Sequence, residues 1–191
     1  MSTKKTRGSI LNRVIVLAAL VAVMWALLAL HVYWPRHSVN HLAIRPHATE
    51  GLWRVLLAPF LHRDVEHLTA NTVPFLLLGG LVLAKSAYEF AFVTFVAMVG
   101  AGAGAWYFGR PGELHLGASG LIFGYLGFLL ARGLFDRTLG SLAIAAVVGF
   151  VYGGLVLGVF PQQPDVSWQS HAAGFAAGIT CGWLLSGQRP Q

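Results

Sequence analysis

Charged residues are scarce in this chain, and cysteine is nearly absent. Only 10% of the 191 residues are Asp, Glu, Lys or Arg, whereas a soluble domain carries about 25%. So little charge cannot coat a water-soluble globule, and 56% of the residues are hydrophobic. The composition therefore predicts an all-α integral membrane protein. The single cysteine, Cys181, excludes an intrachain disulfide and is expected to be a small packing residue.

Six apolar stretches are each close to the roughly 20 residues that cross a bilayer. They are residues 14–34, 67–84, 87–108, 117–132, 139–160 and 167–185. We expect one six-helix domain over residues 14–186, between an N-terminal segment of residues 1–13 and a tail of residues 187–191. The longest connection, about residues 35–66, is expected on the outer side. A cleaved signal peptide is the competing interpretation of the start, but its apolar region would be only about 7–15 residues long.

Basic residues are distributed unevenly between the two predicted sides, which sets the orientation of the chain in a membrane. With the N-terminus in the cytoplasm, the inner side holds Lys4, Lys5, Arg7, Arg13, Lys85, Arg132, Arg137 and Arg189, and the outer side holds Arg36, Arg45, Arg54, Arg63 and Arg110. We therefore expect both termini in the cytoplasm, with a bacterial inner membrane as the best fit. The net charge of +6 is interpreted as this topology signal rather than as a nucleic-acid-binding patch.

Glycines recur at every fourth residue on two of the predicted spans. The fourth span carries Gly120 and Gly124, and the sixth carries a longer series: Gly174, Gly178 and Gly182. Small residues at this spacing let two helix backbones approach closely. We therefore expect the fourth and sixth spans to pack tightly against each other. His171 lies on the face of the sixth span that makes this contact, since it precedes Gly174 by three residues and Gly178 by seven.

Four polar side chains are predicted to lie at one depth, near the outer surface. Ser119 and His171 each lie near the start of a span that runs inward, as do His67 and Asn71, which are four apart and share a helix face. A hydrocarbon interior disfavours such groups, so they are expected to face a cavity or a partner. Ser119 and His171 are the minimum parts of a nucleophilic hydrolase. Asn71, His67 and the Ser119 N–H are candidate donors to an oxyanion.

A carboxylate as third member of a catalytic triad is not expected. Glu66 is adjacent to His67 but about 100° around the helix, and Glu113 and Asp165 lie in predicted loops. We therefore predict a Ser–His dyad in which packing, rather than a carboxylate, holds the imidazole of His171. The odd-numbered spans are expected to contribute nothing comparable at this depth.

These residues resemble the rhomboid family of intramembrane serine proteases. The resemblance covers nearly the whole chain and rests on Trp53-Arg54, His62, His67-x-x-x-Asn71, Gly117-Ala118-Ser119-Gly120, and His171 with Gly174 and Gly178. It implies a six-transmembrane-helix rhomboid-like bundle with a water-filled cavity open to the outside. It also implies that the site residues act as nucleophile (Ser119), general base (His171) and oxyanion stabilisers (Asn71 and His67). The implied substrates are single-span membrane proteins, cut in or near the bilayer.

Phe123 is where this chain departs from the pattern of that family. Many relatives carry a tyrosine one turn after the serine, stacked on the catalytic histidine. The phenylalanine ring can still stack there, but the hydroxyl is absent. Phe123 is therefore expected to support the site together with four glycines: Gly117, Gly120, Gly174 and Gly178.

Three alternatives stay open at this point. One is a catalytically silent rhomboid-like protein that binds client transmembrane helices through the same cavity. Another is a small transporter or channel, although the inner halves of the spans are apolar and glycine-rich. The third is a zinc site formed by His62, His67 and His171, but no carboxylate accompanies them, and we expect no metal and no other cofactor. The other histidines are expected to be loop or boundary residues: His31, His37, His41, His47 and His115.

Overall fold

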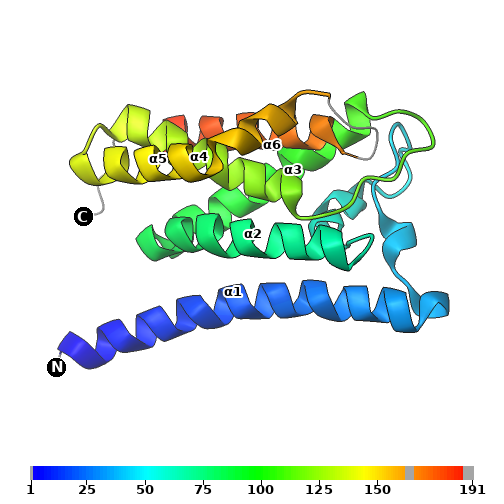
Figure 1. Ribbon diagram of the computed structural model, residues 1–191, viewed down its shortest axis with the longest axis horizontal. Coiled ribbons are helices and arrows are strands. Elements are labelled where there is room, and N and C mark those ends of the chain that lie inside the picture. The colour runs from blue at the N-terminus through cyan, green and yellow to red at the C-terminus, as the bar shows by residue number, and fades with distance from the viewer. Residues whose placement is uncertain (1, 162–165, 187–191) are drawn as a thin grey trace.

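The computed structural model describes residues 2–161 and 166–186, with side chains from Ile10 onward. Within these residues, six α-helices form a bundle (Figure 1). They are α1 (Ser2–Tyr33), α2 (Val65–Lys85), α3 (Ala87–Phe108), α4 (Ser119–Asp136), α5 (Leu139–Tyr152) and α6 (Trp168–Leu184). Short 3₁₀ helices lie in the connections: η1 (Pro35–His37), η2 (Asn40–Leu42), η3 (Leu52–Leu56), η4 (Ala58–Phe60) and η5 (Gly153–Val159). The predicted all-α six-helix bundle is confirmed.

Five helical segments of the described chain are long and apolar enough to cross a bilayer. They are Ile10–Tyr33, Val65–Lys85, Ala87–Phe108, Ser119–Asp136 and Leu139–Val159, the last of which combines α5 with η5. Helix α6 has 17 residues. Among the six α-helices of the described chain, only α5, with 14 residues, is shorter. The protein is therefore an integral membrane protein. Several expectations lie outside the described residues or side chains: those on Lys4, Lys5, Arg7, Asp165, Arg189 and residues 187–191.

Most of the predicted boundaries differ from the observed ones by at least one residue. The starts of α1 and α4 and the end of α5 are among them. Helix α1 already begins at Ser2, ahead of the predicted start at residue 14. Helix α4 begins at Ser119 rather than at residue 117, because Gly117 adopts a φ of 116°, outside the right-handed helical region. Helix α5 ends at Tyr152, and the chain continues as the 3₁₀ helix η5 from two glycines, which are weak formers of α-helix.

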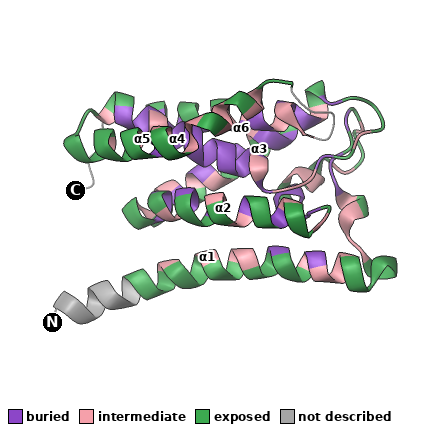
Figure 2. Cartoon of the chain, in the orientation of Figure 1, coloured by how far each residue is buried: buried purple, intermediate pink, exposed green. Residues whose placement is uncertain are grey.

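Helix α4 lies at the centre of the bundle and is buried on nearly all sides (Figure 2). Its closest neighbour is α6, and glycines make the contact. A Cβ added to Gly174 would overlap the carbonyl oxygen of Gly120, and a Cβ added to Gly178 would overlap that of Gly124. The predicted tight packing of the fourth and sixth spans is therefore confirmed, and it brings backbone against backbone.

Helix α1 lies at the edge of the bundle beside α2 and is largely exposed (Figures 1 and 2). Met24 and Leu28 are buried in the shared core, and the Trp25 indole N–H donates to the Thr72 hydroxyl at 3.2 Å. Leu17, Leu20 and Val21 pack partly against the same core, and many other apolar side chains of α1 are exposed, as expected for a helix surrounded by lipid. Helix α1 is therefore attached to the bundle along one narrow stripe.

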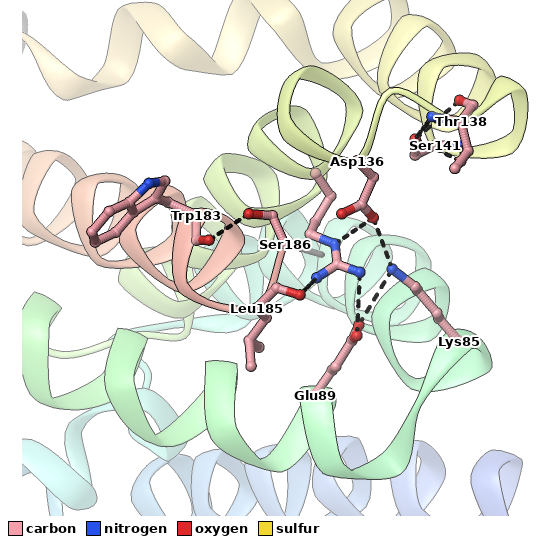
Figure 3. Close-up of polar contacts among 9 residues, drawn as sticks. Lys85, Glu89, Asp136, Thr138, Ser141, Trp183, Leu185 and Ser186 are labelled. Atoms are coloured by element: carbon pink, nitrogen blue, oxygen red, sulfur yellow. Dashed lines mark hydrogen bonds and ion pairs between the residues drawn. The ribbon is translucent and has the colours of Figure 1, made fainter. Parts of the chain in front are cut away.

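Four charged side chains and one carbonyl group close the end of the bundle opposite Ser119 (Figure 3). The Arg132 guanidinium is 2.7 Å from the Asp136 carboxylate and 3.4 Å from that of Glu89, and it donates to the Leu185 carbonyl. The Lys85 ammonium is 3.3 Å from Asp136 and 3.7 Å from Glu89. This inner ion cluster joins the ends of α2, α4 and α6 to the start of α3.

We expect Arg132→Ala to destabilise the bundle by roughly 3 kcal/mol, because it leaves two largely buried carboxylates with only the more exposed Lys85 as their shared partner. Unfolding of the purified protein in detergent, followed by circular dichroism, measures this loss. Arg137→Ala is the matched control. Arg137 is exposed, and among the described residues its side chain donates a hydrogen bond to the Leu134 carbonyl, at 3.4 Å. Equal stability of the two variants would contradict a stabilising role of the inner ion cluster.

Candidate active site

The chain turns sharply at Gly117 so that Ser119 becomes the first residue of α4. A Cβ at Gly117 would lie 2.6 Å from Cε1 of His67, and its φ of 116° disfavours other residues. The Gly117 N–H donates to the Ala58 carbonyl at 2.8 Å, which ties this turn to η4. Glycine is therefore required here both by the backbone conformation and by the close approach of the His67 ring.

His62 fixes the residue that follows this turn. Its ring is buried, and Nε2 accepts a hydrogen bond from the Ala118 N–H at 3.3 Å. Burial, together with the neighbouring His67, lowers the pKa of His62 to about 4. The neutral ring is therefore the form that accepts from Ala118. The backbone of His62 is held in turn by Asn40, whose side-chain amide donates to the His62 carbonyl at 2.8 Å.

Ser119 and His171 are brought together across the contact of α4 with α6. Their Oγ and Nε2 atoms are 2.8 Å apart. The other ring nitrogen of His171, Nδ1, is 3.0 Å from the Gly158 carbonyl oxygen. A carbonyl can only accept, so Nδ1 carries the proton and Nε2 accepts from the Ser119 hydroxyl. In this arrangement the imidazole is oriented to remove the serine proton.

Phe123 lies one turn after Ser119 and stacks on the His171 ring. The two ring centroids are 4.2 Å apart and the rings are inclined by 8°. A Cβ at Gly158 would be 2.9 Å from the Phe123 ring, so the absence of a side chain lets η5 close over this stack. The imidazole is thus held by a ring on one face and by hydrogen bonds at both nitrogens.

A cavity of about 1390 Å³ is lined by the four predicted polar side chains: His67, Asn71, Ser119 and His171. It is named the outer cavity because it lies at the end of the bundle that the sequence predicts to face outward. The Nδ2 atom of Asn71 is buried and has no hydrogen-bond partner among the described residues. An unsatisfied buried donor is costly, so this amide is available for a ligand in the cavity. The first N–H groups of α4 have no partner within the helix, and its dipole favours negative charge at this point.

The first turn of α2 positions His67. Asp64 precedes the helix, and its carboxylate accepts from the His67 N–H at 2.7 Å. This hydrogen bond, together with one from the Arg63 side chain, lowers the pKa of Asp64 below its usual range. The carboxylate therefore stays ionised and caps the helix that carries both His67 and Asn71.

His171 receives no carboxylate from residues 2–161 or 166–186. The prediction that odd-numbered spans contribute no comparable polar side chain left out the backbone: η5 continues the fifth span and supplies the Gly158 carbonyl. Packing by Phe123 therefore shares the task of holding the ring with a backbone hydrogen bond. Sequence reasoning missed Gly158 because a carbonyl oxygen has no residue-specific signal.

His115 lies in the connection between α3 and α4, as predicted, but its side chain is buried, with 6% exposed. Its backbone forms a two-way bridge to Ile44 in the first loop, with both N···O distances at 3.0 Å. This bridge pulls the ring inward, where Nδ1 lies 2.6 Å from the Ser167 hydroxyl. A bridge between distant loop segments cannot be read from local periodicity.

The sequence of this chain is similar to those of known proteins. Residues 49–188 match the Rhomboid domain. The chain belongs to the rhomboid family. An uncharacterized protein of Mycobacterium tuberculosis is 46% identical over 159 residues, which cover 79% of this chain and 65% of the relative. A second mycobacterial relative, from Mycobacterium leprae, is 42% identical over 159 residues, covering 79% and 63%.

More distant rhomboid relatives come from eukaryotes. Human Rhomboid-related protein 3 is 29% identical over 170 residues, covering 82% of this chain and 42% of the human protein. This rhomboid chain therefore spans less than two thirds of the mycobacterial relatives and less than half of the human one. The matched rhomboid domain contains the four predicted polar residues that line the cavity.

We expect acid to destabilise this rhomboid domain through His62. The pKa of His62 is about 4 in the folded protein and 6.5 when the ring is free in water. The unfolded chain therefore binds more protons between these values, and stability falls as the pH drops from 6.5 to 4, by up to about 3 kcal/mol. Melting temperatures in detergent at several pH values measure the slope.

His62→Gln should make this pH dependence shallower, because the glutamine carbonyl can still accept from Ala118 but does not titrate. A smaller slope should remain, since burial also lowers the pKa of His115. His41→Gln is the matched control at an exposed histidine and should keep the wild-type slope. A wild-type slope in His62→Gln would contradict the assignment of this acid sensitivity to His62.

Proposed function

We propose that this rhomboid protein is an intramembrane serine endopeptidase that uses a Ser–His dyad. The observation that carries the proposal is the 2.8 Å hydrogen bond from the Ser119 hydroxyl to Nε2 of His171, beside the outer cavity. The Gly158 carbonyl supports it by selecting the tautomer in which Nε2 is a free base. The Asn71 amide supports it as a donor that has no partner among the residues described.

In the acylation step, Ser119 Oγ forms a bond to the scissile carbonyl carbon while Nε2 of His171 takes the hydroxyl proton. The carbonyl electron pair moves onto oxygen, which gives a tetrahedral oxyanion. Collapse of this intermediate breaks the C–N bond, and His171 gives its proton to the leaving amine. Water then attacks the acyl ester, with His171 removing a water proton and returning it to Ser119 Oγ, which releases the new carboxylic acid.

The oxyanion would be stabilised by donors at the start of α4 and in the first turns of α2. The Ser119 N–H is at the positive end of the α4 dipole, and Asn71 and His67 line the same cavity. Each such preorganised donor is worth about 3–4 kcal/mol in comparable sites. The same residues have no obvious purpose in a protein that only packs helices together.

The proposed substrates are single-span membrane proteins. Ser119 and His171 lie in the first turns of α4 and α6, within the apolar part of the chain but next to a cavity. A peptide carbonyl inside an intact helix is already hydrogen-bonded and is shielded by the helix. We therefore propose that a substrate helix unwinds locally before its carbonyl reaches Ser119.

Ser119→Ala should lower cleavage of a single-span substrate in liposomes by roughly 1,000-fold or more, because the nucleophile is lost. Gel analysis of the products measures this, and a fluorophosphonate probe should label the wild type but not the variant. Ser186→Ala is the matched control, since it removes a serine hydroxyl at the inner end, where Ser186 bonds to the Trp183 carbonyl (Figure 3).

Equal cleavage by the wild type and Ser119→Ala would overturn the proposal. A wild type that captures single-span helices without cutting or labelling would instead favour a silent rhomboid-like protein that binds client helices. The two outcomes are separated in one preparation by measuring both helix capture and product formation.

We also propose that both termini lie in the cytoplasm, with the protein in a bacterial inner membrane. Support comes from Lys85, Arg132 and Arg137, which gather at the end of the bundle opposite the cavity, and from the mycobacterial relatives. Green fluorescent protein fused to the C-terminus should therefore fluoresce. Alkaline phosphatase should be inactive there and active when inserted at Gly112, and the reverse pattern would contradict this orientation.

A further inference from the structure

A second Ser–His hydrogen bond lies beside the first. Nδ1 of His115 is 2.6 Å from Oγ of Ser167. His115 precedes Ser119 by four residues, and Ser167 precedes His171 by four, so both bonds join residues 52 apart. The same two chain segments are therefore bridged twice, with serine and histidine exchanged between them. All four side chains line the outer cavity.

Ser167 is coupled directly to the backbone of His171. Its carbonyl accepts from the His171 N–H at 3.1 Å, in the first turn of α6. Its side chain makes no capping bond to the helix that it precedes. A serine in this position usually caps its own helix, whereas Ser167 directs its hydroxyl to His115. The position of this first turn is thus tied to the loop before α4.

His115 is suited to be the fixed partner of this bond. Its backbone is bridged to Ile44 in both directions, and its ring is buried. A Cβ added to Gly109 would be 2.5 Å from Nε2 of His115, so the ring is closely confined on that side. The loop that contains His115 is therefore anchored independently of α6.

Glu113 sets the direction of the bond. Its carboxylate is 3.5 Å from Nε2 of His115 and accepts from the Arg110 N–H at 3.1 Å. A nearby carboxylate favours the tautomer that carries its proton on Nε2, so Nδ1 accepts from the Ser167 hydroxyl. Burial lowers the pKa of His115 while Glu113 opposes this shift, so the neutral ring that this geometry requires is available at neutral pH.

We propose that His115 and Ser167 are positioning residues that set the distance between Ser119 and His171. This inference rests on the proposed protease activity. The bond fixes the first turn of α6 against the entry to α4, and the dyad lies one turn further along. Because a displacement of about 1 Å can cost about 100-fold in rate, loss of the bond should lower kcat while KM, which reflects substrate binding elsewhere in the cavity, stays nearly constant.

The test compares four variants by the rate at which a fluorophosphonate probe acylates Ser119. His115→Phe and Ser167→Ala remove the bond, and each should slow acylation by roughly 10-fold or more. His115→Asn keeps an amide near the position of Nδ1 and should restore much of the rate. The double variant should be no slower than either single one, because both changes remove the same bond. Ser141→Ala is the matched control and should acylate normally: it removes a serine hydroxyl that accepts from the Thr138 N–H at the start of α5.

Rates are expressed per folded molecule, with melting temperatures measured for every variant. A role confined to stability would lower the melting temperature but leave this rate, kcat and KM unchanged, and that result would overturn the inference. Additive losses in the double variant would also overturn it. Labelling of Ser167 itself in a Ser119→Ala background would do the same, since Ser167 would then be a nucleophile.

A readout that does not need activity separates this inference from the proposed function. Nitrogen NMR of ¹⁵N-histidine protein reports whether Nε2 of His171 accepts a hydrogen bond. That signal should move toward the value of a free imidazole nitrogen in Ser167→Ala and stay in place in Ser141→Ala. If the wild type neither cleaves a substrate nor reacts with the probe, the proposed function fails. The NMR signal then decides the positioning role by itself. An unchanged signal in Ser167→Ala would overturn the positioning role.

Discussion

The close approach of α4 and α6 is the constraint on which the rest of the site depends. One added carbon at Gly174 or Gly178 would overlap a carbonyl oxygen of the facing helix, at Gly120 or Gly124. At this separation, a serine at the start of one helix and a histidine in the first turn of the other are joined by a bond of 2.8 Å. A wider separation would break this bond and leave the Ser119 hydroxyl and Nε2 of His171 without each other as partners.

Polar contacts hold this helix pair at both of its ends. The outer end carries two Ser–His hydrogen bonds, and at the inner end Arg132 of α4 reaches the Leu185 carbonyl just beyond α6. Between the two ends, glycines bring the two backbones into direct contact. The polar contacts therefore add a fixed point at each end of this backbone contact. A rigid pair of this kind is what a proton transfer over a short distance requires.

The sequence was sufficient for those parts of the site that depend on side-chain type and local spacing. Ser119 and His171 stand out as polar residues in apolar runs, and the glycine series marks the helix faces that meet. Gly158 could not be found this way, because it acts through a carbonyl that every residue possesses. His115 was missed for a different reason: its burial follows from a bridge to Ile44, 71 residues away in the chain. The sharp start of α4 depends likewise on a backbone angle.

The exchange of tyrosine for phenylalanine at position 123 is explained by how the imidazole is held. Two in-plane hydrogen bonds, to Ser119 and to the Gly158 carbonyl, fix the His171 ring within its plane. The Phe123 ring, inclined by only 8° at 4.2 Å, limits its motion out of that plane. The aromatic face at position 123 therefore supplies this restraint without a phenol hydroxyl.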